Sequence, residues 1–428
     1  MTQAERHSFF RQGGWMMIST TLSGGFMFAV HLFAPLMPKE EYGLFGALLG
    51  LVGLMMIPVI GLQTTLAQQT AACLDREDEL ELAGTLRSLV GWSFLLWIVV
   101  LLAVWLFQSR LLAGFKISNP AALWMTAAVA LPQLWLPIFM GYLQGRQNFL
   151  WFGWATVLNG LGRFASVGII VAIMGGYAAG AMVGVLLGFA SAFGIALWHS
   201  RQVLSGPASR FEWGRWVSQL IPLTLGLGTV QFILYIDLPV VRQGFEAGLT
   251  GSYAAAGMIG RGLVVFTTPL SIVLFPKLVR SATHAEPTKV LGWAVVCTAA
   301  LGALAALGTS AGAWSIPWLL DQLTLSEAGW AKSLVEKLGP ERRSLLLEAG
   351  ALIPWFVWAM LPLAIANVLI SSALARRDQV AVYGSAAIGV AYGSTIAVWH
   401  PSLHAVIGTL GGFNLLLLLF NAWRARRA

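Results

Sequence analysis

The sequence predicts an all-α, polytopic membrane protein with about twelve transmembrane helices in two six-helix lobes. Three observations carry this prediction. Hydrophobic residues make up 57% of the 428 positions and only 10% are charged, whereas soluble domains have roughly 25% charged residues. Apolar runs of about 20 residues, long enough to cross a bilayer, recur along the whole chain. Short motifs in the first half also recur in the second half.

The apolar runs form two groups of six on either side of a polar stretch at 199–215. We therefore expect an N-terminal lobe over 1–198, a cytoplasmic linker over 199–215 and a C-terminal lobe over 216–428. The expected spans lie near 13–36, 42–69, 88–107, 120–143, 150–173, 176–198, 216–238, 251–276, 289–319, 349–373, 379–399 and 402–422. Twice as many lysines and arginines lie on the side of the N-terminus as on the other side, which predicts that both termini are cytoplasmic.

Two motifs recur at equivalent places in the two halves. Tyr42 is followed by Pro58 sixteen residues later, and Tyr253 is followed by Pro269 at the same spacing. The ends of the fourth and tenth spans read GRQN (145–148) and ARRD (375–378). An even number of spans separates each pair, so the halves share one orientation. This predicts a parallel 6+6 repeat with a site between its halves.

An arginine lies inside the fifth span, where an apolar residue is expected. A lipid-facing arginine there costs at least about 2.5–3.5 kcal/mol, so Arg163 should face protein or a water-filled cavity. Thr156, Asn159 and Ser166 lie on the same helical face, and this polar stripe favours the cavity. We take these four as candidate substrate-binding residues. The alternative is a buried arginine that donates to the carbonyls of a neighbouring helix.

A second arginine, Arg261, lies near the centre of the eighth span, in the other half. Both guanidinium groups offer a fork of donors that matches phosphate oxygens, so we expect them to bind an anionic headgroup in one central cavity. Asp237 lies at the end of the seventh span and Arg242 follows it. We expect Asp237 to form a structural ion pair with Arg261 or Arg242, or to carry a coupling cation.

The sequence has no motif for catalysis or for a cofactor. The histidines and the two cysteines lack metal-ligand spacing, and neither a phosphate-binding glycine loop nor a nucleophile elbow is present. The net charge of +8 comes mostly from loop lysines and arginines that set orientation. We therefore expect no catalytic residue, no cofactor, no metal and no nucleic-acid partner.

GYLQGRQNF (141–149), LNGLGRF (158–164) and the run at 235–279 resemble the polysaccharide-biosynthesis flippases. These O-antigen and exopolysaccharide exporters share a superfamily with the multidrug and toxin extrusion (MATE) transporters and the lipid II flippase. The resemblance implies two MATE-like lobes, alternating access and a cationic cavity. It also implies an undecaprenyl-pyrophosphate-linked oligosaccharide that moves from the inner to the outer leaflet of the bacterial cytoplasmic membrane. Only the intramembrane arginines, at Arg163 and Arg261, match a general feature of that family.

Three other functions stay open. A MATE-type drug/cation antiporter would bind cations through buried carboxylates, whereas this chain buries arginines. An integral-membrane glycan polymerase or ligase would need catalytic groups in a large outer loop, for which 321–348 is the candidate, and it leaves the repeat unexplained. A membrane scaffold that transports nothing is the fourth function. We expect a monomeric transporter rather than an enzyme, with H⁺ or Na⁺ as the candidate coupling cation.

Overall fold

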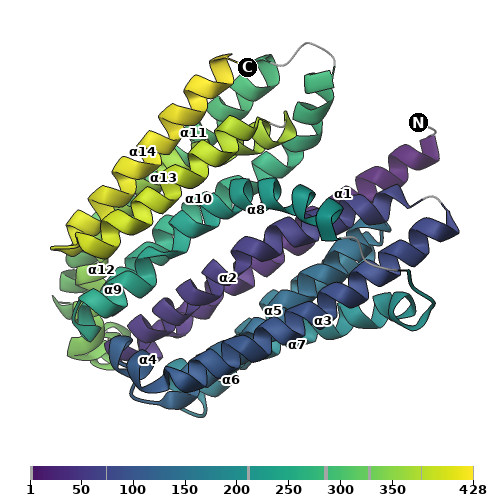
Figure 1. The fold of residues 1–428 in the computed structure, drawn as a ribbon. Helices are drawn as coiled ribbons and strands as arrows, with labels where there is room; N and C mark the ends of the chain where they lie inside the picture. Colours follow the sequence, from purple (N-terminus) through teal and green to yellow (C-terminus); the bar gives the residue numbers. More distant parts are fainter. Residues whose placement is uncertain are drawn as a thin grey trace. The chain divides into compact units, whose positions relative to one another are not determined.

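The computed structural model describes residues 3–73, 75–209, 213–283, 288–325, 329–376 and 378–427. Their side chains are described except at 3–13, 35, 215, 219, 266, 268–283, 288–290, 329–338 and 375. Every regular element in these ranges is a helix (Figure 1). Eleven helices in the described part are long and apolar enough to cross a membrane. Helix α10 (Ala247–Thr283) covers the remaining expected span at 251–276. The predicted all-α membrane fold is confirmed.

The chain divides into two compact units. Unit 1 comprises Met1–Leu36 and Met55–Thr224, and unit 2 comprises Met37–Leu54 and Leu225–Ala428. Helices α2 (Lys39–Ala72) and α8 (Trp213–Tyr235) each pass from one unit into the other. Residues 37–54 thus group with unit 2, which the expected division at 199–215 does not anticipate. The functional division into two lobes stays a prediction.

Unit 1 is built around α6 and α7. Its elements are α1 (Gln3–Ala29), the 3-10 helix η1 (Val30–Leu36), α3 (Arg76–Leu106), α4 (Gln108–Gly114), α5 (Pro120–Gly145), α6 (Phe149–Ala172) and α7 (Tyr177–Ser205). Helix α6 packs against α1 and α7, and α5 packs against α7 and α3. The Asp75 side chain caps α3 by accepting the backbone N–H groups of Glu77 and Asp78, both at 2.9 Å. The polar connection after the second span is therefore the start of α3.

Unit 2 is built around α12. Its further elements are α9 (Asp237–Gly244), α10, α11 (Thr288–Leu325), α12 (Gly329–Ala375), α13 (Gln379–Val398) and α14 (Leu403–Arg427). Helix α12 packs against α10, α11 and α14. It breaks at Gly339, whose φ of 62° favours glycine, and its membrane-crossing part is Gly339–Leu374. The first half of α2 is tied to α12 by an ion pair of 2.5 Å between Lys39 and Glu348.

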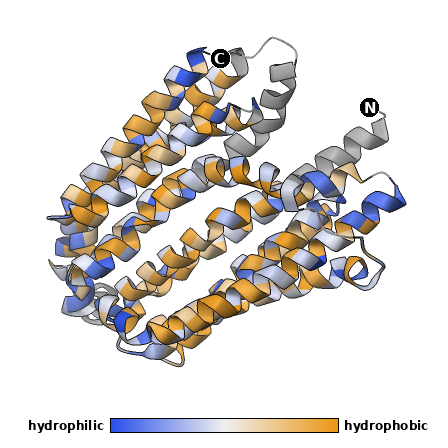
Figure 2. Ribbon diagram, in the orientation of Figure 1, coloured by the Kyte–Doolittle hydropathy of each residue, from blue (hydrophilic) through white to orange (hydrophobic). Residues whose placement is uncertain are grey.

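Polar residues gather at the ends of the long helices, and apolar residues fill their middles, as α3 and α14 illustrate (Figure 2). On α3 large apolar side chains such as Trp92, Val99 and Trp105 are more than half exposed. An apolar surface of this extent suits contact with lipid. Two parts of the predicted repeat, Arg377 and the side chain of Pro269, lie outside the described residues.

Candidate functional site

The polar stripe of α6 lies opposite an exposed apolar face of the same helix. The residues of that face are Leu150, Trp154, Leu161 and Ile169, which are between 38% and 54% exposed. With 3.6 residues per turn they lie about 140–240° around the helix from Arg163, whereas the rest of the stripe lies within about 60° of it. On this side α6 packs against α7, because a Cβ at Gly188 of α7 would lie 2.8 Å from the Asn159 carbonyl oxygen and 2.9 Å from the Arg163 Cβ. Arg163 therefore points away from the surface that acyl chains would cover.

Arg163 packs against α7. Its guanidinium carbon lies 5.0 Å from the centroid of the Phe189 ring, and the residue is half-buried. Gly188 permits this approach, because a Cβ at that position would lie 2.9 Å from both the backbone nitrogen and the Cβ of Arg163. An aromatic face attracts a guanidinium through the quadrupole of the ring. This contact does not neutralise the positive charge of Arg163, and that charge attracts anions.

The other residues of the stripe differ in how their polar atoms are used. Thr156 donates its hydroxyl to the carbonyl of Phe152 at 2.9 Å, within the same helix. The side-chain oxygen of Asn159 is buried and has no hydrogen-bond partner among the described residues. Ser166 is half-buried one turn further along. Asn159 is therefore the group next to Arg163 whose acceptor suits a hydroxyl donor.

Arg261 of α10 forms a buried ion pair with Asp237 of α9. The Arg261 Nη2 lies 2.7 Å and 2.6 Å from the two carboxylate oxygens, and Nε donates to the Leu234 carbonyl at 2.5 Å. Tyr253 donates its hydroxyl to Asp237 at 2.6 Å, and the ring of Phe356 lies 5.6 Å from the guanidinium carbon. Asp237 is fully buried and the Arg261 side chain is 8% exposed. The pair is therefore sealed within unit 2.

Arg242 serves a different contact. It is 2% exposed, and its Nη1 donates to the Glu40 carbonyl at 3.1 Å and to the Thr250 hydroxyl at 3.0 Å. These bonds join α9 to α10 and to the first turn of α2. Of the two predicted pairings of Asp237, the structure forms the one with Arg261, while Arg242 anchors the start of α2 to unit 2.

The structure brings together only part of the predicted site. Arg163 belongs to unit 1 and Arg261 to unit 2, so a cavity that they share stays a prediction. The partners Phe189, Tyr253 and Phe356 were not predicted. The recurrence of a tyrosine and proline drew attention to Tyr253, but only as a repeat marker. Nothing in the sequence singles out the two phenylalanines among 23.

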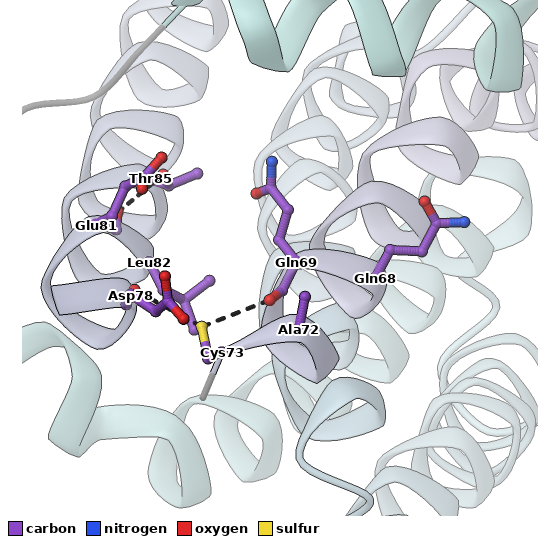
Figure 3. Close-up of a pocket in the computed structure, with 8 residues that line it drawn as sticks. All are labelled: Gln68, Gln69, Ala72, Cys73, Asp78, Glu81, Leu82 and Thr85. Atoms are coloured by element: carbon purple, nitrogen blue, oxygen red, sulfur yellow. Dashed lines mark hydrogen bonds between the residues drawn. The ribbon is translucent and has the colours of Figure 1, made fainter. Parts of the chain in front are cut away.

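A separate polar cavity of about 250 Å³ lies between the end of α2 and the start of α3 (Figure 3). Gln69, Asp78 and Glu81 line it, and its carboxylates oppose binding of a phosphate. The Sγ of Cys73 lies 3.5 Å from the Gln69 carbonyl and 3.6 Å from that of Asp78. Burial, and then the charge of Asp78, raises the pKa of the Cys73 thiol. The thiol is therefore a weaker nucleophile near neutral pH than an unperturbed cysteine.

Comparison with known proteins begins with a family model. The model described as "Polysaccharide biosynthesis protein" matches residues 9–282. That range contains every residue of the predicted site, from Thr156 to Arg261. No protein with a curated description matches the chain by sequence.

Solved structures of similar fold cover nearly the whole chain. The lipid II flippase MurJ in an inward closed conformation has a TM-score of 0.71 at 14% identity, over 95% of this chain and 87% of that one. An inward-facing multidrug resistance MATE family transporter of the MOP superfamily has a TM-score of 0.63 at 14% identity, over 96% and 94%. A MOP superfamily transporter from Pyrococcus furiosus, described as having a binding pocket of reverse polarity, has a TM-score of 0.56 at 14% identity, over 97% and 94%. These likenesses establish the MATE-like fold.

Proposed function

The chain belongs to the polysaccharide biosynthesis protein family, and on this premise we propose that it flips an undecaprenyl-pyrophosphate-linked oligosaccharide across the bacterial inner membrane. The chain is a multi-pass membrane transporter with a MATE-like fold. Transport runs from the inner to the outer leaflet by alternating access of the lobes 1–198 and 216–428 about the linker 199–215. Both termini lie in the cytoplasm, because the basic loops predict that orientation. The protein works as a monomer and catalyses no reaction.

The placement of Arg163 carries this proposal. It lies in the middle of α6, on the side opposite the exposed apolar face, and its guanidinium contacts the ring of Phe189. A guanidinium there can bind a pyrophosphate through two parallel hydrogen bonds. The side-chain oxygen of Asn159 accepts a hydrogen bond from a hydroxyl of the adjoining sugar, and Thr156 and Ser166 extend the polar path along α6. The hydrophobic tail stays in the bilayer, because hydrocarbon gains nothing by entering a polar path.

Arg261 joins the site only when Asp237 releases it. Removing one partner of a buried ion pair costs about 3–5 kcal/mol, because the other charge is left uncompensated. Neutralisation of Asp237 by a proton, or its capture by Na⁺, would free the Arg261 guanidinium for an anionic headgroup. Asp237 is thus the proposed coupling residue, and Arg242 keeps the neighbouring helices in place.

Complementation in cells tests the function. A strain that lacks this gene and displays no surface glycan is supplied with wild type, Arg163→Glu or the control Arg201→Glu. We expect wild type and the control to restore surface glycan, and Arg163→Glu to reach the membrane without restoring it. Drug resistance conferred by wild type without any glycan export would instead establish the MATE-type antiporter. Glycan that accumulates as shorter chains would point to the polymerase or ligase.

A further inference from the structure

The last helix of each six-span group has, near its C-terminal end, a tryptophan three residues before an arginine. The sequence reads LWHSR at 197–201 on α7 and AWRAR at 422–426 on α14. In both places a guanidinium lies over the indole: on α7 it belongs to Arg201, three residues after the tryptophan, and on α14 to Arg427, four residues after it. The carbon of the Arg201 guanidinium is 3.8 Å from the Trp198 ring centroid, and that of Arg427 is 4.3 Å from the Trp423 ring centroid. Both indoles are exposed, at 64% and 45%.

The arginines at the end of α14 divide into one that is neutralised and two that are not. Arg424 forms a two-armed ion pair with Asp378, with Nη2 2.8 Å from Oδ1 and Nε 3.2 Å from Oδ2. Asp378 also caps α13 by accepting the Ala381 N–H at 3.1 Å. Arg426 and Arg427 are exposed, and within the described ranges neither forms a salt bridge with a side-chain carboxylate. Their charges are therefore available to an anion from outside the chain.

An apolar stripe leads along α14 to these two arginines. Leu416, Leu419 and Trp423 follow one another at helical spacing, are 49%, 59% and 45% exposed, and Arg427 lies one turn further on. Hydrocarbon, indole and guanidinium thus succeed one another along one face. The same order of chemistry runs along a phospholipid from its acyl chain through its interfacial region to its phosphate.

We infer that the end of α14 binds the headgroup of an anionic phospholipid. Arg426 and Arg427 contact the phosphate, Trp423 lies at the level of the glycerol, and one acyl chain follows Leu419 and Leu416. The apolar stripe selects a lipid over a free phosphate, because only a lipid covers it. At the end of α7 the site is weaker: Arg201 is a single charge, and its Nη1 already donates to the Trp198 carbonyl at 3.2 Å.

Native mass spectrometry of the full chain in micelles that hold equal amounts of phosphatidylglycerol and phosphatidylcholine tests this inference. A basic residue near an anionic surface contributes roughly a fivefold preference, so the double variant Arg426→Gln/Arg427→Gln should lose retained phosphatidylglycerol by on the order of 20-fold relative to phosphatidylcholine. Trp423→Ala should reduce both lipids. The control Arg201→Gln should change retention by less than the double variant.

Equal retention of the two lipids by wild type would overturn the inference, and so would unchanged phosphatidylglycerol in the double variant. Inorganic phosphate that displaces the bound lipid at millimolar concentration would also contradict it, because the stripe would then add nothing. The variants leave the Asp378–Arg424 pair intact, and their melting temperatures in micelles verify that they fold. The inference does not depend on the proposed transport, since retention is measured without it.

Discussion

Replacing Asp237 by Asn should destabilise the protein far more than the same replacement at an exposed ion pair of unit 2. The substitution keeps the shape of the side chain and its ability to accept from Tyr253, but it leaves the Arg261 guanidinium buried without its counter-charge. Both oxygens of Asp237 lie within 2.7 Å of Nη2, and Asp237 is fully buried. Removing one partner of such a pair costs about 3–5 kcal/mol.

The assay is reversible unfolding of the purified protein in mixed detergent micelles, followed by near-ultraviolet circular dichroism. The matched control is Asp321→Asn, which removes an ion pair to Arg343 of 3.3 Å whose side chains are 66% and 42% exposed. That change should cost less than about 1 kcal/mol, because water screens the pair. The double variant Asp237→Leu/Arg261→Met should recover much of the loss. Asp237→Asn within about 0.5 kcal/mol of wild type, with additive double-variant energies, would refute a coupled buried pair.

Three further predictions follow from single contacts. Burial alone would raise the pKa of Asp378. The hydrogen bonds from Arg424 and from a backbone N–H lower this pKa by more than burial raises it, so the net pKa is below the usual range. The stability that Asp378 contributes is therefore complete above about pH 4 and is lost as pH falls through the lower folded pKa; Asp378→Asn should flatten the acid limb of melting temperature against pH. Gly188→Val should destabilise by about 1–3 kcal/mol through overpacking, measured by the same unfolding assay, whereas Gly194→Ala, with nothing within 4 Å, should not. Maleimide should label Cys73 more slowly at neutral pH than a free thiol, by site-resolved mass spectrometry, because its pKa is raised.

Contrary results are equally specific. An acid limb that is unchanged in Asp378→Asn would mean that other carboxylates dominate acid unfolding. Equal destabilisation by the two glycine substitutions would mean that the α6–α7 contact at Gly188 has no special tightness. Labelling of Cys73 at the rate of free glutathione would show that burial and the charge of Asp78 do not raise the pKa of its thiol.

The membrane fold was predictable because the bilayer imposes one requirement on every span. A run such as 88–107 must be apolar over about 20 residues to cross hydrocarbon, whatever it packs against. That Arg163 avoids the lipid-facing side of its helix was predictable too, because a charged side chain within an apolar span must face protein or water. Its orientation relative to the apolar face of α6 also follows from local helical spacing.

Long-range packing was not predictable in the same way. Asp237 had two basic candidates, Arg242 five residues away and Arg261 twenty-four residues away, and spacing alone could not choose between them. The choice depends on how α9 and α10 pack, with Tyr253 and Phe356 closing the pair off. Likewise, nothing local in 37–54 indicates that the start of α2 packs with unit 2, because the Lys39–Glu348 contact joins residues 309 positions apart.

Flipping of a fluorescent undecaprenyl-pyrophosphate oligosaccharide in proteoliposomes, read by quenching of the label in the outer leaflet, tests directly whether Arg163 binds the pyrophosphate of a transported lipid. Wild type and the control Arg201→Gln should move the lipid. Arg163→Gln should lower the apparent affinity for the transported lipid by roughly 10–100-fold, since a hydrogen bond to a charged group contributes about 1.5–3 kcal/mol. Arg163→Lys, which keeps the charge but loses the fork, should fall between them. Transport by Arg163→Gln at the wild-type rate and affinity, or no transport by wild type, would contradict the assignment.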